Sequence, residues 1–126
     1  MIPFHCLAKS NYKMTINGRI IQTKKEIIVI DHTCYLSLDD LDFLLSDEYE
    51  LWQKESDLSV VIKNEKEISY AVVDHQYAVI KSKIKKISAA PVWYNGNLYL
   101  PVSFCAQVSG HYLIKSKSYL QFFKWS

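Results

Sequence analysis

The feature that most constrains the fold of this chain is a pattern that occurs twice. The segment APVWYNGNLYLPVSF at 90–104 has a weaker counterpart, EIIVIDHTCYLSLDD, at 26–40. The Tyr-Leu pair of each segment begins at Tyr35 and at Tyr99, an offset of 64 residues. Each segment reads as two strands joined by a two-residue turn and followed by a new element. We therefore expect one structural unit to be written twice.

Two-residue turns recur at the same offset. Asn-Gly is the strongest short hairpin signal, because a type I′ turn needs positive φ at both central residues. The turn candidates fall on equivalent positions of two copies, Asn17-Gly18 with Lys81-Ser82 and Asp31-His32 with Asn95-Gly96. The shared order of turns, helix and strands predicts copies over 1–63 and 64–126, although few residues are identical.

Each copy also predicts one short helix. In the second copy Pro101 stands where a first helical turn tolerates a missing N–H, and Gly110 supplies the left-handed residue that ends a helix. In the first copy Asp39 and Asp40 provide an acidic first turn. A helix of this length is unstable alone and must pack against a sheet.

The predicted fold class is α+β, with two tandem repeats, each an antiparallel sheet curled around one short α-helix. No spare linker residues surround Lys63-Asn64. We therefore expect the two copies to pack as one compact body.

The composition fits a globular protein and gives little support to several kinds of partner. Among the 126 residues, 49% are apolar and 22% are charged, and the net charge is +2. This balance predicts no nucleic-acid partner. No stretch is long and apolar enough to span a bilayer, and the first residues lack the pattern of a signal peptide, so we expect no membrane insertion.

Lysines concentrate in two segments, KSKIKK at 81–86 and KSKSYLQFFK at 115–124. The simpler interpretation is that they cover the solvated faces and exposed edges of strands. An anionic partner is the alternative.

The chain contains three cysteines, which cannot all pair with one another and so form no disulfide framework. His32 and Cys34 have the spacing of two ligands on one strand face, but His32 falls at a predicted turn and Cys34 alternates with apolar residues. The other candidate ligands, which show no motif spacing, are His5, Cys6, His75, Cys105 and His111. We therefore predict no metal site and no cofactor.

No residue pattern supports catalysis. Cys105 is expected on the buried face of its helix, where a thiol behaves as a small hydrophobe. Asp39, Asp40 and Asp42 resemble an acidic cluster that could serve in catalysis. Asp39 and Asp40 need no such role, because acidic residues are favoured at the N-terminus of a helix. With three glycines in all, the chain has no Gly-rich phosphate loop. The chain is predicted not to be an enzyme, with no catalytic residues.

Aromatic residues are in surplus, with nine Tyr, five Phe and three Trp. Most alternate within strands, which indicates core or cross-strand packing. Trp93 and Tyr94 point to opposite faces of their strand, so one of them is expected to face solvent. A row of flat rings on a sheet suits a glycan or a peptide, and the candidates are Trp93, Tyr94, Tyr99, Tyr112 and Tyr119.

The second copy resembles the repeat of the copper amine oxidase N-terminal-like domains, also called stalk domains. The matching positions are Ala90-Pro91, Asn95-Gly96, Leu100-Pro101-Val102, the helix through Ala106, and Gly110. Trp52 stands at the family's Trp position in the first copy. Three positions depart from the pattern: Ser103 replaces an Arg, Ser37 a Pro, and Lys81-Ser82 an Asn-Gly pair.

The resemblance implies that each repeat is an antiparallel β-sheet of about five strands curled around one short α-helix. It also implies a non-catalytic binding or structural module in a cell-envelope protein of Gram-positive bacteria. It would act as a spacer or contact a protein or a cell-wall glycan, and a homodimer through sheet edges is compatible with it. The resemblance carries over no copper ligands. The alternative is a free-standing intracellular protein, for instance phage-encoded, that uses the same fold as a ligand-binding or inhibitory protein.

Overall fold

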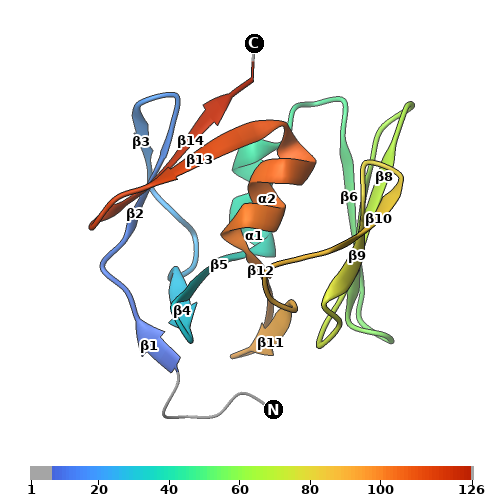
Figure 1. Ribbon diagram of the computed structural model, residues 1–126, viewed down its shortest axis with the longest axis horizontal. Helices are drawn as coiled ribbons and strands as arrows, with labels where there is room; N and C mark the ends of the chain where they lie inside the picture. Colours follow the sequence, from blue (N-terminus) through green and yellow to red (C-terminus); the bar gives the residue numbers. More distant parts are fainter. Residues whose placement is uncertain (1–6, 126) are drawn as a thin grey trace.

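The computed structural model describes the backbone of residues 7–125 and the side chains of residues 10–125, so the candidate ligands His5 and Cys6 lie outside the described residues. The described residues form two short α-helices and three sheets. In Figure 1 the helices lie at the centre, with one sheet on each side and the third below them. The fold is mostly β-structure, in agreement with the predicted α+β class.

Sheet A lies below the helices in Figure 1 and has the order β1-β4-β5-β12-β11. Its strands are β1 (Leu7–Lys9), β4 (Ile28–Ile30), β5 (Thr33–Ser37), β12 (Asn97–Pro101) and β11 (Val92–Tyr94). Two hairpins meet at its centre, where Leu36 pairs with Leu100 and Tyr35 with Pro101. The bounds of β4 and β5 differ from those of β11 and β12 by 64 residues throughout.

Sheet B has the order β13-β14-β2-β3. Its strands are β13 (His111–Lys115), β14 (Tyr119–Lys124), β2 (Lys13–Ile16) and β3 (Arg19–Ile21). The last hairpin of the chain therefore joins the first one, and β14 pairs with β2 in parallel. The other strand pairs between residues 7 and 125 are antiparallel.

Sheet C, on the opposite side of the helices from sheet B, has the order β10-β9-β8-β7-β6 (Figure 1). Its strands are β6 (Glu50–Lys54), β7 (Ser59–Lys63), β8 (Ile68–Val72), β9 (Tyr77–Ile80) and β10 (Lys83–Lys86). The predicted boundary between copies at residues 63 and 64 falls in the connection between β7 and β8, which are paired neighbours. Strands β6 and β10 form the two edges of this sheet.

The expectation of one sheet per half is not met, because each of the three sheets draws strands from both halves of the chain. The physical reason is the small size of each half. One short helix and a few short strands bury too little apolar surface to form a separate core. Because the sheets combine hairpins from both halves, they enclose both helices in one main core, which includes Met14, Leu36, Leu100, Phe104 and Phe122.

The four predicted two-residue turns are confirmed. Both central residues of each turn have positive φ, with values of 50° and 82° at Asn17-Gly18 and 51° and 76° at Asn95-Gly96. Asp31-His32 and Lys81-Ser82 adopt the same conformation without a glycine, at 48° and 68° and at 50° and 68°. Positive φ at both central positions is characteristic of the type I′ turn, so all four turns require the same backbone conformation.

The second helix, α2 (Val102–Ser109), is confirmed from Pro101 at its N-cap to Gly110 at its C-cap, where φ is 74°. The first, α1 (Leu38–Leu41), is shorter than predicted and continues as the 3-10 turn η2 (Asp42–Leu44). No left-handed residue ends it, since the chain leaves η2 through an extended Leu45.

Candidate interaction surfaces

The outer face of sheet C carries a continuous apolar row. Trp52 lies opposite Val61, Val61 opposite Tyr70, Tyr70 opposite Val79, and Val79 opposite Ile84. Residues directly opposite each other in an antiparallel sheet project to the same side. The row therefore crosses all five strands, a span of about 19 Å at the usual strand spacing. We call these five residues the sheet C row.

The sheet C row is open to solvent at both ends. Trp52 is 56% exposed, Ile84 is 79% exposed, and Tyr77, which lies on the same face two residues before Val79, is 65% exposed. The alternate positions of the middle strands, such as Val60 and Ile80, are buried in the core. The outer face is thus an exposed apolar surface rather than part of the core.

Lysines frame this surface. Lys63 lies with its Nζ 5.6 Å from the centre of the Trp52 ring and 3.9 Å from a carboxylate oxygen of Glu50. Lys54 and Lys86 occupy the same face of β6 and β10, by the alternation of side chains along a strand. The frame carries more positive than negative charge.

The structure separates the aromatic residues that the sequence grouped together. Tyr99 is 3% exposed, so the expectation of an exposed ring is wrong for this residue. It lies on a central strand of sheet A and belongs to a second small core with Ile28, Ile30 and Tyr35. Tyr94 packs against this core, with its ring 6.1 Å from that of Tyr99. Trp93, on the opposite face of β11, is exposed.

The other two predicted aromatics lie on sheet B. Tyr112 is exposed and contacts two rings, with centres 5.3 Å away at Phe123 and 4.8 Å away at Trp125. Tyr119 is half-buried at the start of β14. The five candidates therefore do not form one row, and their ligand-binding role stays a prediction.

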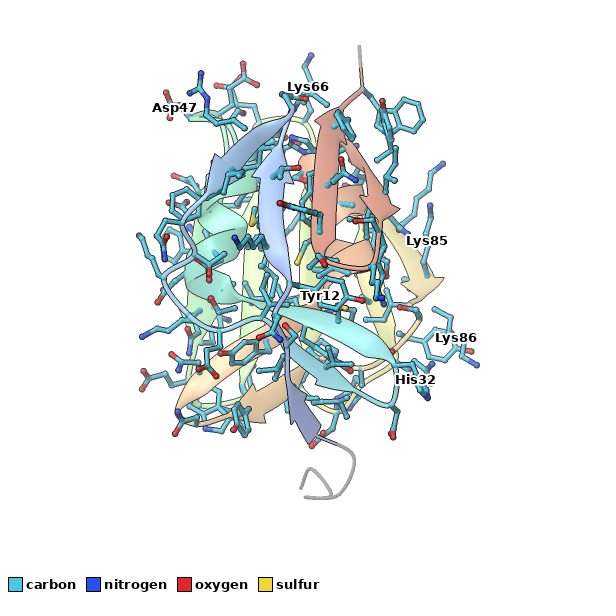
Figure 2. The ribbon with its side chains drawn as sticks, turned by 90° about the vertical axis from the view of Figure 1, so that its left-hand side faces the viewer. Tyr12, His32, Asp47, Lys66, Lys85 and Lys86 are labelled. Atoms are coloured by element: carbon cyan, nitrogen blue, oxygen red, sulfur yellow. The ribbon has the colours of Figure 1, made fainter. Side chains whose placement is uncertain are left out.

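A groove lined by lysines lies beside the edge of sheet C. It has a volume of about 550 Å³, and its lining includes Lys81, Lys83, Lys85, Lys86, His111 and Trp125. No Asp or Glu is among the lining residues. The fold thus brings the lysine segment 81–86 next to the end of the last hairpin. Figure 2 shows Lys85 and Lys86 extending outward from the edge of the molecule.

The buried histidine of this groove has a structural partner. His111 Nδ1 lies 2.9 Å from Ser109 Oγ, whose hydroxyl donates to the carbonyl of Cys105 at 2.7 Å. The hydroxyl oxygen therefore accepts from Nδ1–H. Burial lowers the pKa of His111, and the nearby charge of Lys124 lowers it further.

The two described cysteines are core residues. Cys34 is buried in the main core, as expected from its alternation with leucines, while His32 lies on an exposed turn. Cys105 is fully buried on α2, and burial raises the pKa of its thiol, which disfavours the nucleophilic thiolate. These environments fit structural thiols.

The residues do not fit a copper site. Across the described part of the chain, no group of three or more His, Cys, Asp or Glu side chains gathers closely enough to hold a metal ion. Nor is any helix between residues 7 and 125 both long and apolar enough to cross a bilayer.

In the sequence, Trp52 stands out only as a position of the family pattern, and no candidate site includes it. The exposed face appears only when strands β6 to β10 are set in register, because no short segment contains more than one or two of its residues. Alternate residues of a strand at 50–54 project to opposite faces of the sheet. This alternation alone does not show which of the two faces is covered by the rest of the protein.

The fold and surfaces define a β-rich module with two small helices, buried thiols and exposed apolar and basic surfaces. The family model for the copper amine oxidase N-terminal domain matches residues 15–118, and the chain belongs to this family. This domain is the non-catalytic N-terminal module of copper amine oxidases. Searches of the curated proteins and of the solved structures found no match.

Proposed function

We propose that this chain is a binding module of a bacterial cell-envelope protein and that it holds a protein partner on the outer face of sheet C. The observation that carries the proposal is the sheet C row, with Trp52 and Ile84 exposed at opposite edges of the sheet. On soluble proteins, a large contiguous exposed apolar patch usually marks an interaction site, whereas single exposed apolar residues are common.

Side-chain chemistry favours a protein over a glycan. Flat rings stack on sugars, but aliphatic side chains such as Ile84, Ile68 and Val79 contribute by excluding water against another apolar surface. Ile84 and Ile68 are both exposed on this face. The lysine frame adds charge complementarity, so the expected partner presents an apolar patch with acidic residues around it.

The division of the chain into copies 1–63 and 64–126 is part of this proposal. Two regularities support it: the 64-residue spacing of the type I′ turns, and the pairing of Leu36 with Leu100, which places equivalent residues opposite each other. Such pairing is what a local two-fold axis between copies produces. Each copy contributes strands to the partner-binding sheet.

The cell-envelope location, in Gram-positive bacteria, rests on the family resemblance. This location is tested by fractionating cells in which the gene for the protein carries a tag at its own chromosomal locus. Recovery of the chain in the envelope fraction, within a longer polypeptide, is the expected result. A 126-residue species in the cytosol would favour the alternative of a free-standing intracellular binding protein.

Binding is tested with a partner recovered from envelope extract and then purified. Trp52→Ser with Ile84→Ser is expected to weaken the measured Kd at least about tenfold. A tenfold change corresponds to about 1.4 kcal/mol, and Trp is enriched among interface residues whose truncation costs about 2 kcal/mol or more. The matched control is Ile20→Ser with Ile114→Ser, two exposed positions on sheet B. Unchanged affinity in the first variant would contradict the proposal. So would binding of the wild type only to insoluble cell-wall glycan, or only to a second copy of itself.

A further inference from the structure

Strand β10 is an open edge with unpaired backbone groups. It pairs with β9 on one side only, and all four of its residues are exposed. The turn at Lys81-Ser82 makes Ile80 and Lys83 the closing pair of the hairpin. In such a hairpin the closing pair exchanges both hydrogen bonds, and the bonded pairs then alternate along the strands. The N–H and C=O groups of Ile84 and Lys86 therefore point to the open side.

The side chains of this edge present a distinct pattern on each face. Lys83 lies opposite Ile80 and Lys85 opposite Ala78, two residues of the buried face, so these lysines project toward the groove. By the alternation of side chains along the strand, Ile84 and Lys86 lie on the outer face, where Ile84 ends the sheet C row. Lys86, at the end of the strand, also borders the groove. In the described part of the chain, the only ion pair within 4.0 Å joins Lys63 to Glu50, so the lysines of β10 carry no such partner.

A second copy of the chain is a poor occupant of this edge. Antiparallel pairing of β10 with itself would place lysines opposite lysines, and like charges directly opposite each other destabilise a sheet. Lysines on an edge oppose self-pairing in this way. They favour a strand that carries the opposite charge.

We infer that β10 is a docking strand for an extended acidic peptide, which adds to sheet C as a further strand. The inference rests on the proposed function in treating the chain as a protein-binding module, and it names a second recognition element. An antiparallel peptide would pair with the backbone of Ile84 and Lys86. Its acidic side chains would lie opposite Lys83, Lys85 and Lys86, and an apolar one opposite Ile84. This is recognition by strand addition, with main-chain bonds for affinity and side chains for specificity.

The complementary sequence is Glu-Glu-Val-Glu, read from the position opposite Lys86 to the position opposite Lys83. The probe is a fluorescein-labelled peptide, Thr-Glu-Glu-Val-Glu-Thr, titrated into the wild-type chain. Two peptides serve as controls: one with proline in place of valine, which keeps the charge but blocks strand addition, and one with lysines in place of the glutamates. Saturable binding of the probe alone is expected.

Charge reversal in the protein tests the side-chain contacts. Lys83→Glu with Lys85→Glu is expected to weaken probe binding about tenfold or more and to allow binding of the lysine peptide, since two cross-strand pairs change sign. Lys66→Glu with Lys117→Glu makes the same change in net charge at exposed residues outside β10 and should leave probe binding within about twofold.

Amide hydrogen exchange distinguishes strand pairing from electrostatic attraction, because attraction between charged side chains alone would not protect specific backbone amides. Saturating probe is expected to protect the amides of Ile84 and Lys86, while those of Lys83 and Lys85 are already bonded to β9. The inference is overturned if the proline peptide or inorganic polyphosphate competes as well as the probe, if those two amides stay unprotected, or if the probe does not bind. Trp52→Ser should not alter probe binding, so failure here and failure of the sheet C proposal are distinguishable.

Discussion

Asp40 is a fully buried carboxylate that ties together separate parts of the chain. Its oxygens accept from the backbone N–H groups of Lys24 and Lys25, at 2.7 and 3.1 Å, and from the Ser37 hydroxyl at 2.9 Å. The Asp40 N–H donates in turn to Ser37 Oγ at 3.2 Å. Helix capping was predictable from the sequence, whereas the bonds to the 24–25 segment were not, because they depend on a tertiary approach.

Replacing Asp40 with alanine should lower the free energy of unfolding by about 3 kcal/mol, because several donors lose a charged acceptor at a buried site. The matched control is Asp39→Ala, an exposed carboxylate in the same helical turn, with an expected change of about 0.5 kcal/mol or less. Urea unfolding followed by circular dichroism measures both. Equal losses in the two variants would mean that Asp40 acts only through the helix dipole.

His111 gives the molecule a pH-dependent stability. Its pKa is lowered in the folded state, so the unfolded chain binds a proton first as the pH falls below about 6.5. Stability is therefore full above that pH and decreases as the pH falls toward the lower folded pKa. His111→Asn should reduce the loss of stability between about pH 7.5 and pH 5, measured by urea titration. If His111→Asn kept the wild-type slope, His111 would not be the source of this pH dependence.

At the scale of elements, the local sequence was sufficient for the turns and for α2. Asn95-Gly96 and Gly110 act through their own backbone conformations, which neighbouring residues specify directly. The assembly of hairpins into sheets was not predictable in the same way. Pairings such as β14 with β2 and β12 with β5 join residues far apart in sequence, and many registers satisfy the same alternation of apolar residues.

The turn at Asp31-His32 offers a stabilising substitution. His32 has a φ of 68° and an exposed side chain, so His32→Gly removes left-handed strain at little contact cost. The flexibility of glycine in the unfolded chain offsets part of this gain, so the free energy of unfolding is expected to rise by about 0.5–1 kcal/mol. His75→Gly, at a residue without positive φ, should give no gain. Thermal unfolding compares the two, and a destabilised His32→Gly chain would show that the turn does not store this strain.

At the scale of the whole molecule, the two halves depend on each other. Each sheet takes strands from both halves, and the Tyr35 hydroxyl donates to the carbonyl of Ala90 at 3.0 Å. The exposed face of sheet C is itself a product of this exchange, since β6 and β7 come from the first half and β8 to β10 from the second. This is why its row could not be read from either half alone.

Separate fragments 1–63 and 64–126 should therefore be unfolded in isolation and should fold together when mixed, because each supplies strands that the other lacks. Amide dispersion in NMR spectra of each fragment, and of the equimolar mixture, measures this directly. A dispersed spectrum from either fragment alone would show that one half forms an independent domain.

The most direct test of the sheet C proposal is photo-crosslinking in living cells. A photoreactive phenylalanine analogue is placed at Trp52 or Tyr77 on the outer face of sheet C, or at Ile20 or Tyr112 on sheet B, all of which are exposed. One discrete crosslinked protein is expected from the two sheet C positions and none from the sheet B positions. No crosslink at either sheet C position, or the same products from all four positions, would contradict the sheet C proposal.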